Sequence, residues 1–354
     1  MMNETASSGE GGPTLPPSTA PKAFPLSVSG NFDSEEQAQI LANNVYATIQ
    51  ILGSYIDLER LDGVTVADDY DGALQQLDRG FTPSRPLTRS NSERITGVAM
   101  SPAVKRDGVV KAHLLFAAWA IRSLLNSDDR ETASDAIYTI AHECGHVEDL
   151  KLRDEAFPGL ILSSHYVRYD QAAVGPVADT VWEEYAACRI SAPFAKAKQV
   201  SYYETGLRSA LDGARDRSNA AIREYRLHGD LNRGVSEAGE HICEPLRMFG
   251  YLLGTLDGHE ATIEETAPDA VAAIAGGPYA ELFARTQVIL RDLWTNRRRW
   301  ISTASFEPLR QVVRDALKEA GVILTVLPDG QVHVGFPFLP GTLPSDSCTR
   351  LAGA

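Results

Sequence analysis

The chain has 354 residues, of which 44% are hydrophobic and 23% are charged, so it is long enough to bury one large core or two smaller ones. It carries 33 Lys and Arg residues against 47 Asp and Glu residues, a net charge of −14, and its longest basic run is only Arg297–Arg299. This balance argues against nucleic-acid partners, and the lack of any run of about 18 to 20 apolar residues argues against a membrane span.

The amino-terminal segment is rich in Pro, Gly, Ser and Thr. Such a composition cannot bury enough apolar surface to offset the entropy lost on ordering, so residues 1–30 are predicted to be a disordered tail. The segment also lacks the basic and apolar regions of a secretory signal. The four cysteines are widely spaced, without a CxxC pair, which predicts neither a disulfide framework nor a cysteine-rich zinc site. A cytoplasmic protein is therefore expected. Its oligomeric state stays open.

The first predicted helix begins after Ser34, because Ser34-Glu35-Glu36-Gln37 has the form of a capping box and apolar residues then recur at helical spacing. A β-rich stretch follows. It consists of a strand at 63–67, a short helix at 72–77, a loop at 82–93, and strands at 95–100 and 109–116 around a turn at 105–108.

Helical periodicity dominates from about residue 132 onward. Helices are predicted at 132–150, 174–193, 199–227, 232–256, 279–296 and 306–320, and the stretch Pro328-Asp329-Gly330 predicts a hairpin between strands at 322–327 and 332–335. This order indicates an α+β fold: a small β-sheet upstream, a mainly helical region, and a C-terminal β-hairpin. The expected organisation is a tail (1–30), a region of helix, strands and two further helices (31–195), a helical region (196–300), and a C-terminal helix, hairpin and tail (301–354).

The predicted helix at 132–150 contains the sequence His142-Glu143-Cys144-Gly145-His146, which has the form HExxH. Residues four apart lie about 40° apart around a helix, so the two imidazoles can share one metal ion. Glu143 lies about 100° from His142, beside the open position of such a metal, where a general base for bound water belongs. The apolar residues of this helix fall on the other side, so the histidines are expected to face a cleft.

A catalytic zinc usually has three protein ligands and one water, so a third ligand must come from another element. Leu152 occupies the position at which the metzincins place a third histidine, which excludes that class. The following helix offers two candidates, Glu183 and Glu184. Glu184 lies at the edge of the apolar stripe of its helix, whereas Glu183 projects about 160° away from Val181, so Glu184 is preferred and Glu183 is the alternative.

Together these residues resemble the gluzincin class of HExxH zinc metallopeptidases, which includes thermolysin-like peptidases and compact bacterial regulatory peptidases of the HExGH form. The resemblance covers the motif and, more loosely, the helix at 181–189. It implies a zincin-like core, one zinc ion per chain, and a peptide or protein substrate. It also implies His142 and His146 as zinc ligands, Glu143 as the general base, and Glu184 or Glu183 as the third ligand.

Two positions depart from that pattern: Glu148 stands where zincins usually have an apolar residue, and Cys188 stands where many gluzincins have an aspartate. Asp149 lies on the histidine face, where it either contacts a ligand histidine or is solvated. These departures motivate an alternative function, a catalytically idle zincin-fold module that regulates or binds other proteins and holds a structural zinc.

The donor that would stabilise a developing oxyanion is not marked by any motif. We name His241 as the candidate for this second catalytic role. Four other residues of the downstream helices are also possible donors: His228, Tyr202, Tyr203 and Tyr251.

Overall fold

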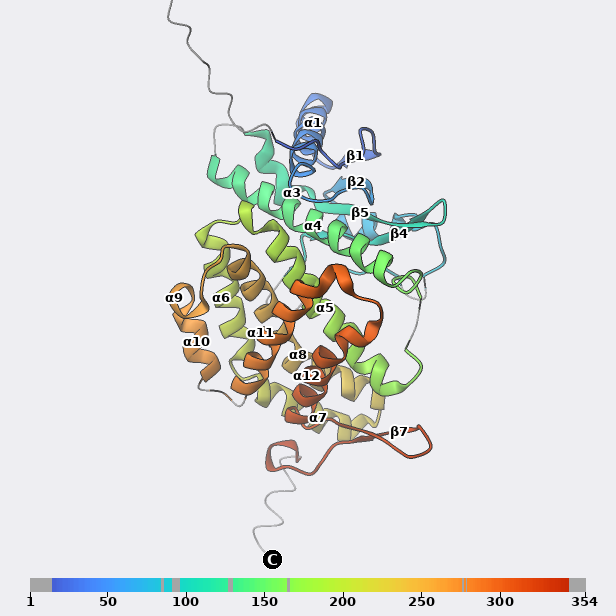
Figure 1. The fold of residues 1–354 in the computed structure, drawn as a ribbon, viewed down its shortest axis with the longest axis vertical. Coiled ribbons are helices and arrows are strands. Elements are labelled where there is room, and N and C mark those ends of the chain that lie inside the picture. Colours follow the sequence, from blue (N-terminus) through green and yellow to red (C-terminus); the bar gives the residue numbers. More distant parts are fainter. Residues whose placement is uncertain are drawn as a thin grey trace, which may run out of the picture.

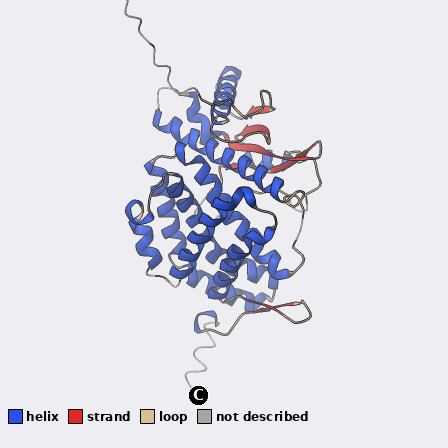
Figure 2. Ribbon diagram, viewed as in Figure 1, coloured by secondary structure: helices blue, strands red, loops and turns tan. Residues whose placement is uncertain are grey.

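The computed structural model describes residues 15–83, 86–90, 96–126, 130–163, 166–275, 277 and 279–343. Its architecture is α+β, with a small mixed sheet at one end of the molecule and most of the helices at the other (Figure 1). A separate two-stranded hairpin lies at the far end of the helical part, as Figure 2 shows. No helix in these ranges combines the length and the apolar character needed to cross a membrane.

The mixed sheet has the strand order β1-β2-β5-β3, and β4 also pairs with β5. Strands β1 and β2 pair in parallel, as do β2 and β5, whereas β3 and β4 run antiparallel to β5. The strands are β1 (Leu26–Ser29), β2 (Leu61–Ala67), β3 (Ala99–Met100), β4 (Ala103–Arg106) and β5 (Val109–Ala117). The tight turn between β4 and β5 uses positive φ angles at Asp107 and Gly108, as the predicted turn requires.

The predicted tail at residues 1–30 is wrong for the part that the structure describes. Thr19 donates from its backbone N–H and from its hydroxyl to Gly53 O, at 2.8 and 2.9 Å. Residues 26–29 then form β1, which pairs with β2. The composition of the segment misled the prediction, because a strand in this position is stabilised mainly by backbone hydrogen bonds to its neighbour. Residues 1–14 lie outside the described residues.

The predicted helices are present, with shifted ends. The first is α1 (Glu35–Leu52), whose N-cap Ser34 accepts a hydrogen bond from Gln37 N, and the short one is α2 (Tyr70–Gln76). The others are α4 (Arg130–Ala156), α5 (Tyr169–Ser191), α6 (Ala197–Leu211), α7 (Ala214–His228), α8 (Leu231–Gly258), α11 (Ala280–Asn296) and α12 (Glu307–Glu319).

Several predicted boundaries are corrected. The helix expected at 199–227 is two helices, α6 and α7, because Gly213 adopts a left-handed conformation (φ 64°) between them. A strand is expected at 95–100, and within the described part of this range it covers only Ala99–Met100. Three short helices were not predicted, α3 (Ala118–Ile121), α9 (Ile263–Thr266) and α10 (Pro268–Ala275). The C-terminal hairpin is confirmed as β6 (Ile323–Val326) and β7 (Val332–Gly335).

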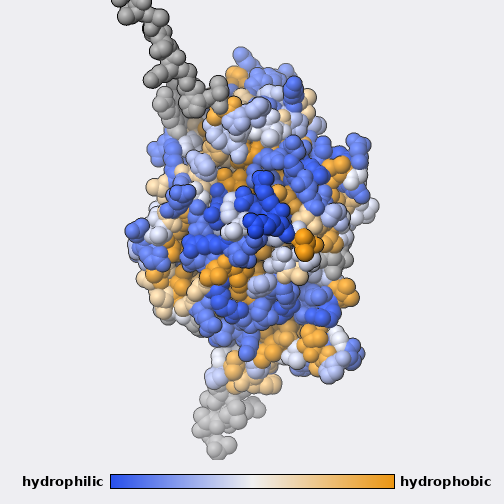
Figure 3. All heavy atoms as spheres, in the orientation of Figure 1, coloured by the Kyte–Doolittle hydropathy of each residue, from blue (hydrophilic) through white to orange (hydrophobic). Residues whose placement is uncertain are grey.

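The buried side chains form two large clusters with α4 between them. One cluster joins the sheet, α1 and the face of α4 that carries Ile140, Cys144 and Val147. The other joins α5, α6, α7, α8, α11 and α12, and it includes Tyr138 from the opposite side of α4. Helix α5, which lies in the expected region 31–195, therefore shares its buried side chains with the later helices. On the face shown in Figure 3, hydrophilic residues cover much of the middle of the molecule.

Candidate metal centre

Helices α4 and α5 run antiparallel and approach each other closely. Three contacts follow one another along the pair: His142 with Cys188, Asp149 with Trp182, and Arg153 with Glu183. At Gly145 an added Cβ would lie only 2.8 Å from Ala187 O, so the two backbones touch at this point. The glycine in the middle of the motif is thus what lets α5 come near enough to face both histidines.

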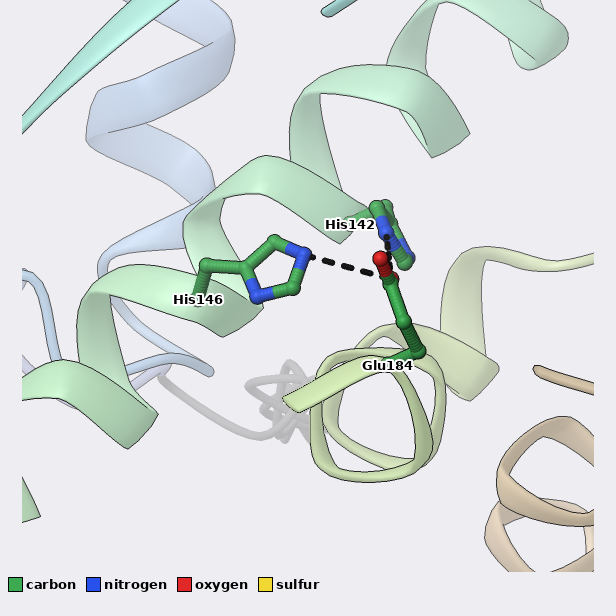
Figure 4. Close-up of side chains that lie close together, drawn as sticks. All are labelled: His142, His146 and Glu184. Atoms are coloured by element: carbon green, nitrogen blue, oxygen red, sulfur yellow. Dashed lines mark ion pairs between the residues drawn. The ribbon is translucent and has the colours of Figure 1, made fainter. Parts of the chain in front are cut away.

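His142, His146 and Glu184 meet across this contact (Figure 4). Glu184 Oε2 lies 3.3 Å from His142 Nε2 and 3.5 Å from His146 Nε2. One ligand atom from each residue lies within 4.8 Å of the others, so the group could hold a metal ion. The side chains are largely enclosed, with exposed fractions of 12%, 19% and 15%. The structure therefore brings together the two motif histidines and the preferred glutamate.

Glu184 favours the charged forms of His142 and His146, and they favour the charged form of Glu184. Burial acts to raise the pKa of Glu184, but hydrogen bonding and the charges of His142 and His146 outweigh it and hold that pKa well below its usual range. Burial likewise acts to lower the pKa of both histidines, and Glu184, together with Cys188 beside His142, raises both values instead. Glu184 is therefore ionised, which is the form in which a carboxylate binds a metal.

Glu143 lies beside this group and is only 6% exposed. Its Oε2 accepts a hydrogen bond of 2.6 Å from the Ser101 hydroxyl, which also lies 3.0 Å from the Glu143 carbonyl oxygen. Ser101 directly follows β3, so the edge of the sheet orients a carboxylate that projects from α4. Sequence reasoning missed Ser101, because no local pattern links a loop serine to a helix 40 residues away.

A cavity of about 1020 Å³ opens onto these side chains. Tyr251 of α8 lines it and stacks on the His142 ring, with 5.8 Å between the ring centroids. Tyr203 stacks on Tyr251 at 5.1 Å, and its hydroxyl lies 2.9 Å from that of Tyr138. Burial, and then the nearby Glu184 carboxylate, raise the pKa of Tyr251 well above its usual value. Its phenol therefore stays protonated and can act as a hydrogen-bond donor.

The two unusual positions of the motif region have clear partners. Glu148 Oε2 accepts a 2.9 Å hydrogen bond from Asp57 N, which ties α4 to the loop before β2. Cys188 Sγ lies 3.6 Å from His142 Nδ1, so a thiol contacts the ring nitrogen of this histidine that does not face Glu184. Both departures are therefore built into the local packing.

Asp149 and Glu183 hold the helix pair together. Asp149 is 2% exposed, accepts a 2.8 Å hydrogen bond from Trp182 Nε1, and pairs with Arg153 at 2.9 Å. It is therefore neither solvated nor hydrogen-bonded to a ligand histidine. Glu183 forms an ion pair with Arg153, and Glu184 is the glutamate that faces the histidines.

The structure does not bring His241 to the cavity. Helix α8 lines it through Arg247, Met248 and Tyr251, whereas His241 stands ten residues before Tyr251, about 15 Å away along the helix axis. The choice of His241 is therefore wrong for this position, and Tyr251, Tyr202 and Tyr203 are the open candidates that do line the cavity. Choosing among them required knowing which part of α8 crosses α4, and helical periodicity does not contain that information.

Known proteins offer no match that would identify this centre. Comparison of the chain with protein-family models, with curated proteins and with solved structures found no match in any of the three. The case for a function therefore depends on the geometry of the site itself: two histidines and a glutamate that could hold a metal ion, with a second glutamate beside them in a cavity.

Proposed function

We propose that this protein is a zinc-dependent metallopeptidase of the gluzincin type, in which His142, His146 and Glu184 bind one zinc ion per chain. The distances from Glu184 to the two histidines carry the proposal. Two ligand atoms about 2.0–2.1 Å from a tetrahedral zinc lie about 3.3–3.4 Å apart. The distances from Glu184 Oε2 to the two Nε2 atoms are 3.3 and 3.5 Å.

The donor set also fits zinc. Two histidines and one glutamate are the ligands of many catalytic zinc sites, which keep a fourth position for water or substrate. Glu184 Oε2 is buried and lacks a hydrogen-bond partner among the described residues, although a buried carboxylate oxygen normally has one. His142, His146 and Glu184 line the cavity, so a zinc ion held by them would be accessible to water and substrate.

The roles of the surrounding residues follow from their positions. A zinc ion bound here supplies a water of lowered pKa and polarises the carbonyl of a peptide bond. Glu143 accepts the proton of the attacking water and passes it to the leaving amine, while Ser101 holds the Glu143 carboxylate in one orientation. The protonated phenol of Tyr251, stacked on His142, is placed to donate to the developing oxyanion.

The fold supports a zincin-like core in one further respect. Strand β3 is the last strand in the order of the sheet, and residues 98–100 line the cavity beside the metal-binding side chains. An edge strand has unpaired backbone groups that can bind an extended peptide by adding it as a further strand. A peptide held in this way would pass over Glu143 and the metal centre.

The test is a comparison of the parent protein with Glu143→Gln. We expect both proteins to hold about one zinc per chain by elemental analysis, because Glu143 is not a ligand. Cleavage of a peptide library, followed by mass spectrometry, should fall about 10²–10⁴-fold or more in Glu143→Gln, because a general base is lost. Glu155→Gln, an exposed carboxylate on the same helix, should leave both zinc content and cleavage unchanged.

A protein that stays zinc-free after zinc is added, or a Glu143→Gln variant that cleaves as fast as the parent, contradicts the proposal. A zinc-loaded protein that cleaves no peptide would favour the alternative, an idle zincin-fold binding module. The features that motivated this alternative, Glu148 and Cys188, have local packing roles that are compatible with an active enzyme.

A further inference from the structure

The metal-binding side chains stand between two chemically different ends of the cavity. Because α4 and α5 are antiparallel, the amino-terminal end of α4 lies near the start of α6, where Asp135 of α4 pairs with Lys198 of α6. The other end is bounded by Thr180 of α5 and Arg247 of α8. Helices α5 and α8 run in the same direction there, since Gly250 contacts Val181 and Gly254 contacts Tyr185.

Almost every charge that lines the cavity already has a close partner. Among the described lining residues, Asp135 is paired with Lys198, Glu183 with Arg153, and Glu184 with the two histidines, while Glu143 accepts a hydrogen bond from Ser101. Each of the four lining carboxylates and one of the two lining cations therefore has a neighbour within 3.5 Å. The remaining cation is Arg247.

Arg247 forms a long i,i+3 ion pair with Glu244 of its own helix and no hydrogen bond to it in the part of the chain that the structure describes. Its Nη2 lies 3.9 Å from Glu244 Oε1, beyond hydrogen-bonding distance, and its Nε is buried without a hydrogen-bond partner among the described residues. The side chain is 24% exposed, so the guanidinium is partly removed from water yet reachable from the cavity. The guanidinium is planar, partly buried and reachable from the cavity, so it is suited to binding a carboxylate through two parallel hydrogen bonds.

The position of Arg247 relates it to the proposed chemistry. It stands one helical turn before Tyr251, which is a rise of about 6 Å along α8, and Tyr251 stacks on His142. An extended peptide advances about 3.3–3.6 Å per residue, so Arg247 lies within about two residues of a peptide bond held at the metal. Behind it, a second cavity of about 690 Å³ between α5 and α8 shares Thr180 and Arg247 as lining residues.

We infer that Arg247 anchors a carboxylate of the substrate at this end of the cavity and so determines which peptides are bound. The inference rests on the proposed peptidase function and adds the substrate class: peptides that carry a negative charge about one or two residues from the bond that is cleaved. That carboxylate is either the free C-terminus of the peptide or the side chain of Asp or Glu. The second cavity provides room for the residue that bears it.

The experiment measures binding as well as cleavage, with three matched pools of N-acetylated random hexapeptides. The first pool has free C-termini and no Asp or Glu, the second is its carboxamide form, and the third is the carboxamide form with one Glu at varied positions. Each pool is passed over immobilised, zinc-loaded Glu143→Gln protein, and retained peptides are quantified by mass spectrometry. We expect the first or the third pool to be retained at least tenfold better than the second, since one charged hydrogen bond contributes about tenfold or more.

That preference should disappear in Arg247→Gln and be partly kept in Arg247→Lys, which retains the charge without the planar fork. Arg233→Gln removes an exposed arginine of the same helix and should keep the full preference. Preference for the first pool assigns the anchor to a free C-terminus, and preference for the third assigns it to an acidic side chain.

Equal retention of the three pools by the parent site, or a preference that survives in Arg247→Gln, overturns the inference. Cleavage of the same pools by the protein with Glu143 intact separates the two proposals. If retention depends on the carboxylate but no peptide is cleaved, the result supports the role of Arg247 as an anchor and contradicts the peptidase function. If peptides with a carboxylate and their carboxamide forms are cleaved equally fast, the result supports the peptidase function and contradicts the role of Arg247 as an anchor.

Discussion

Two adjacent glutamates on α5 show how strongly one helical step changes the role of a side chain. Glu184 faces His142 and His146, whereas Glu183, about 100° further round the helix, pairs with Arg153. Both are carboxylates in partly buried positions and both line the cavity. Their different partners make them a matched pair for testing the proposed zinc site.

Glu184→Gln should weaken zinc binding by about 10²-fold or more, because an amide oxygen replaces a charged ligand. Glu183→Gln should leave the zinc affinity within a few-fold of the parent and act on stability instead, since it removes one of the two carboxylates that pair with Arg153. Competition titration with a chromophoric chelator measures both affinities. A Glu183→Gln variant that loses zinc while Glu184→Gln keeps it would reverse the assignment.

The residues of the site differ in how well the sequence could predict them. His142, Glu143 and His146 belong to one short helical motif, so their relation follows from helix geometry alone. Glu184 could be preferred over Glu183 because the apolar stripe of α5 indicates its buried face. Ser101, Arg247 and Tyr251 could not be identified, because their placement depends on how distant elements pack against α4. The choice of His241 failed for the same reason.

At the scale of elements, the close contact of α4 and α5 depends on Gly145. A Cβ at this position would lie 2.8 Å from Ala187 O and 2.9 Å from Ala187 Cα, and neither backbone atom can move without shifting a helix. The contact is thus a fixed feature of the helix pair that positions the proposed zinc ligands. In α6, a Cβ at Gly206 would meet only the flexible end of Met248.

We expect Gly145→Ala to lower the free energy of unfolding by about 1–3 kcal/mol, since overpacking outweighs the gain in helix propensity of about 1 kcal/mol. Zinc affinity should also fall, because α5 must move away from the histidines. Gly206→Ala should change stability far less. Urea denaturation and chelator competition give the two quantities. A Gly145→Ala protein with unchanged stability and affinity would show that α4 and α5 do not touch as described.

The elements themselves were largely predictable, with instructive exceptions. The long helices and the Pro328-Asp329-Gly330 hairpin carry strong local signals, and the structure confirms them. Strand β1 does not, because its pairing with β2 is a long-range backbone interaction within a segment of unfavourable composition. The break at Gly213 was missed because the residues on both sides of it continue a helical pattern.

At the scale of the whole molecule, α4 and α5 link the sheet to the helical part. Trp182 and Tyr185 of α5 are completely buried in the larger cluster, together with side chains from α8, α11 and α12. Asp257 of α8 strengthens this link, because it accepts a 2.8 Å hydrogen bond from Tyr185 and pairs with Arg291 of α11. The region up to residue 195 therefore lacks the partners that cover α5.

A fragment of residues 1–195 should consequently fail to fold into a stable unit, although it contains all three proposed zinc ligands. Removal of the later helices exposes the apolar face of α5, and each large side chain left in water forfeits about 1.5–3 kcal/mol. Circular dichroism with urea denaturation should show a cooperative transition for the full chain and none for the fragment. A fragment that unfolds cooperatively and binds zinc as the full chain does would restore a domain boundary near residue 195.

The contact between Ser101 and Glu143 differs in kind from the contacts among the metal-binding residues. His142, His146 and Glu184 all belong to the α4 and α5 pair, so their spacing is a local property of two helices in contact. The Ser101 hydroxyl reaches Glu143 from the edge of the sheet. A small displacement of the sheet against the helices would therefore leave the affinity for metal intact while it turned the base away. Binding of the proposed zinc ion and its use in the proposed reaction are therefore mechanically separable.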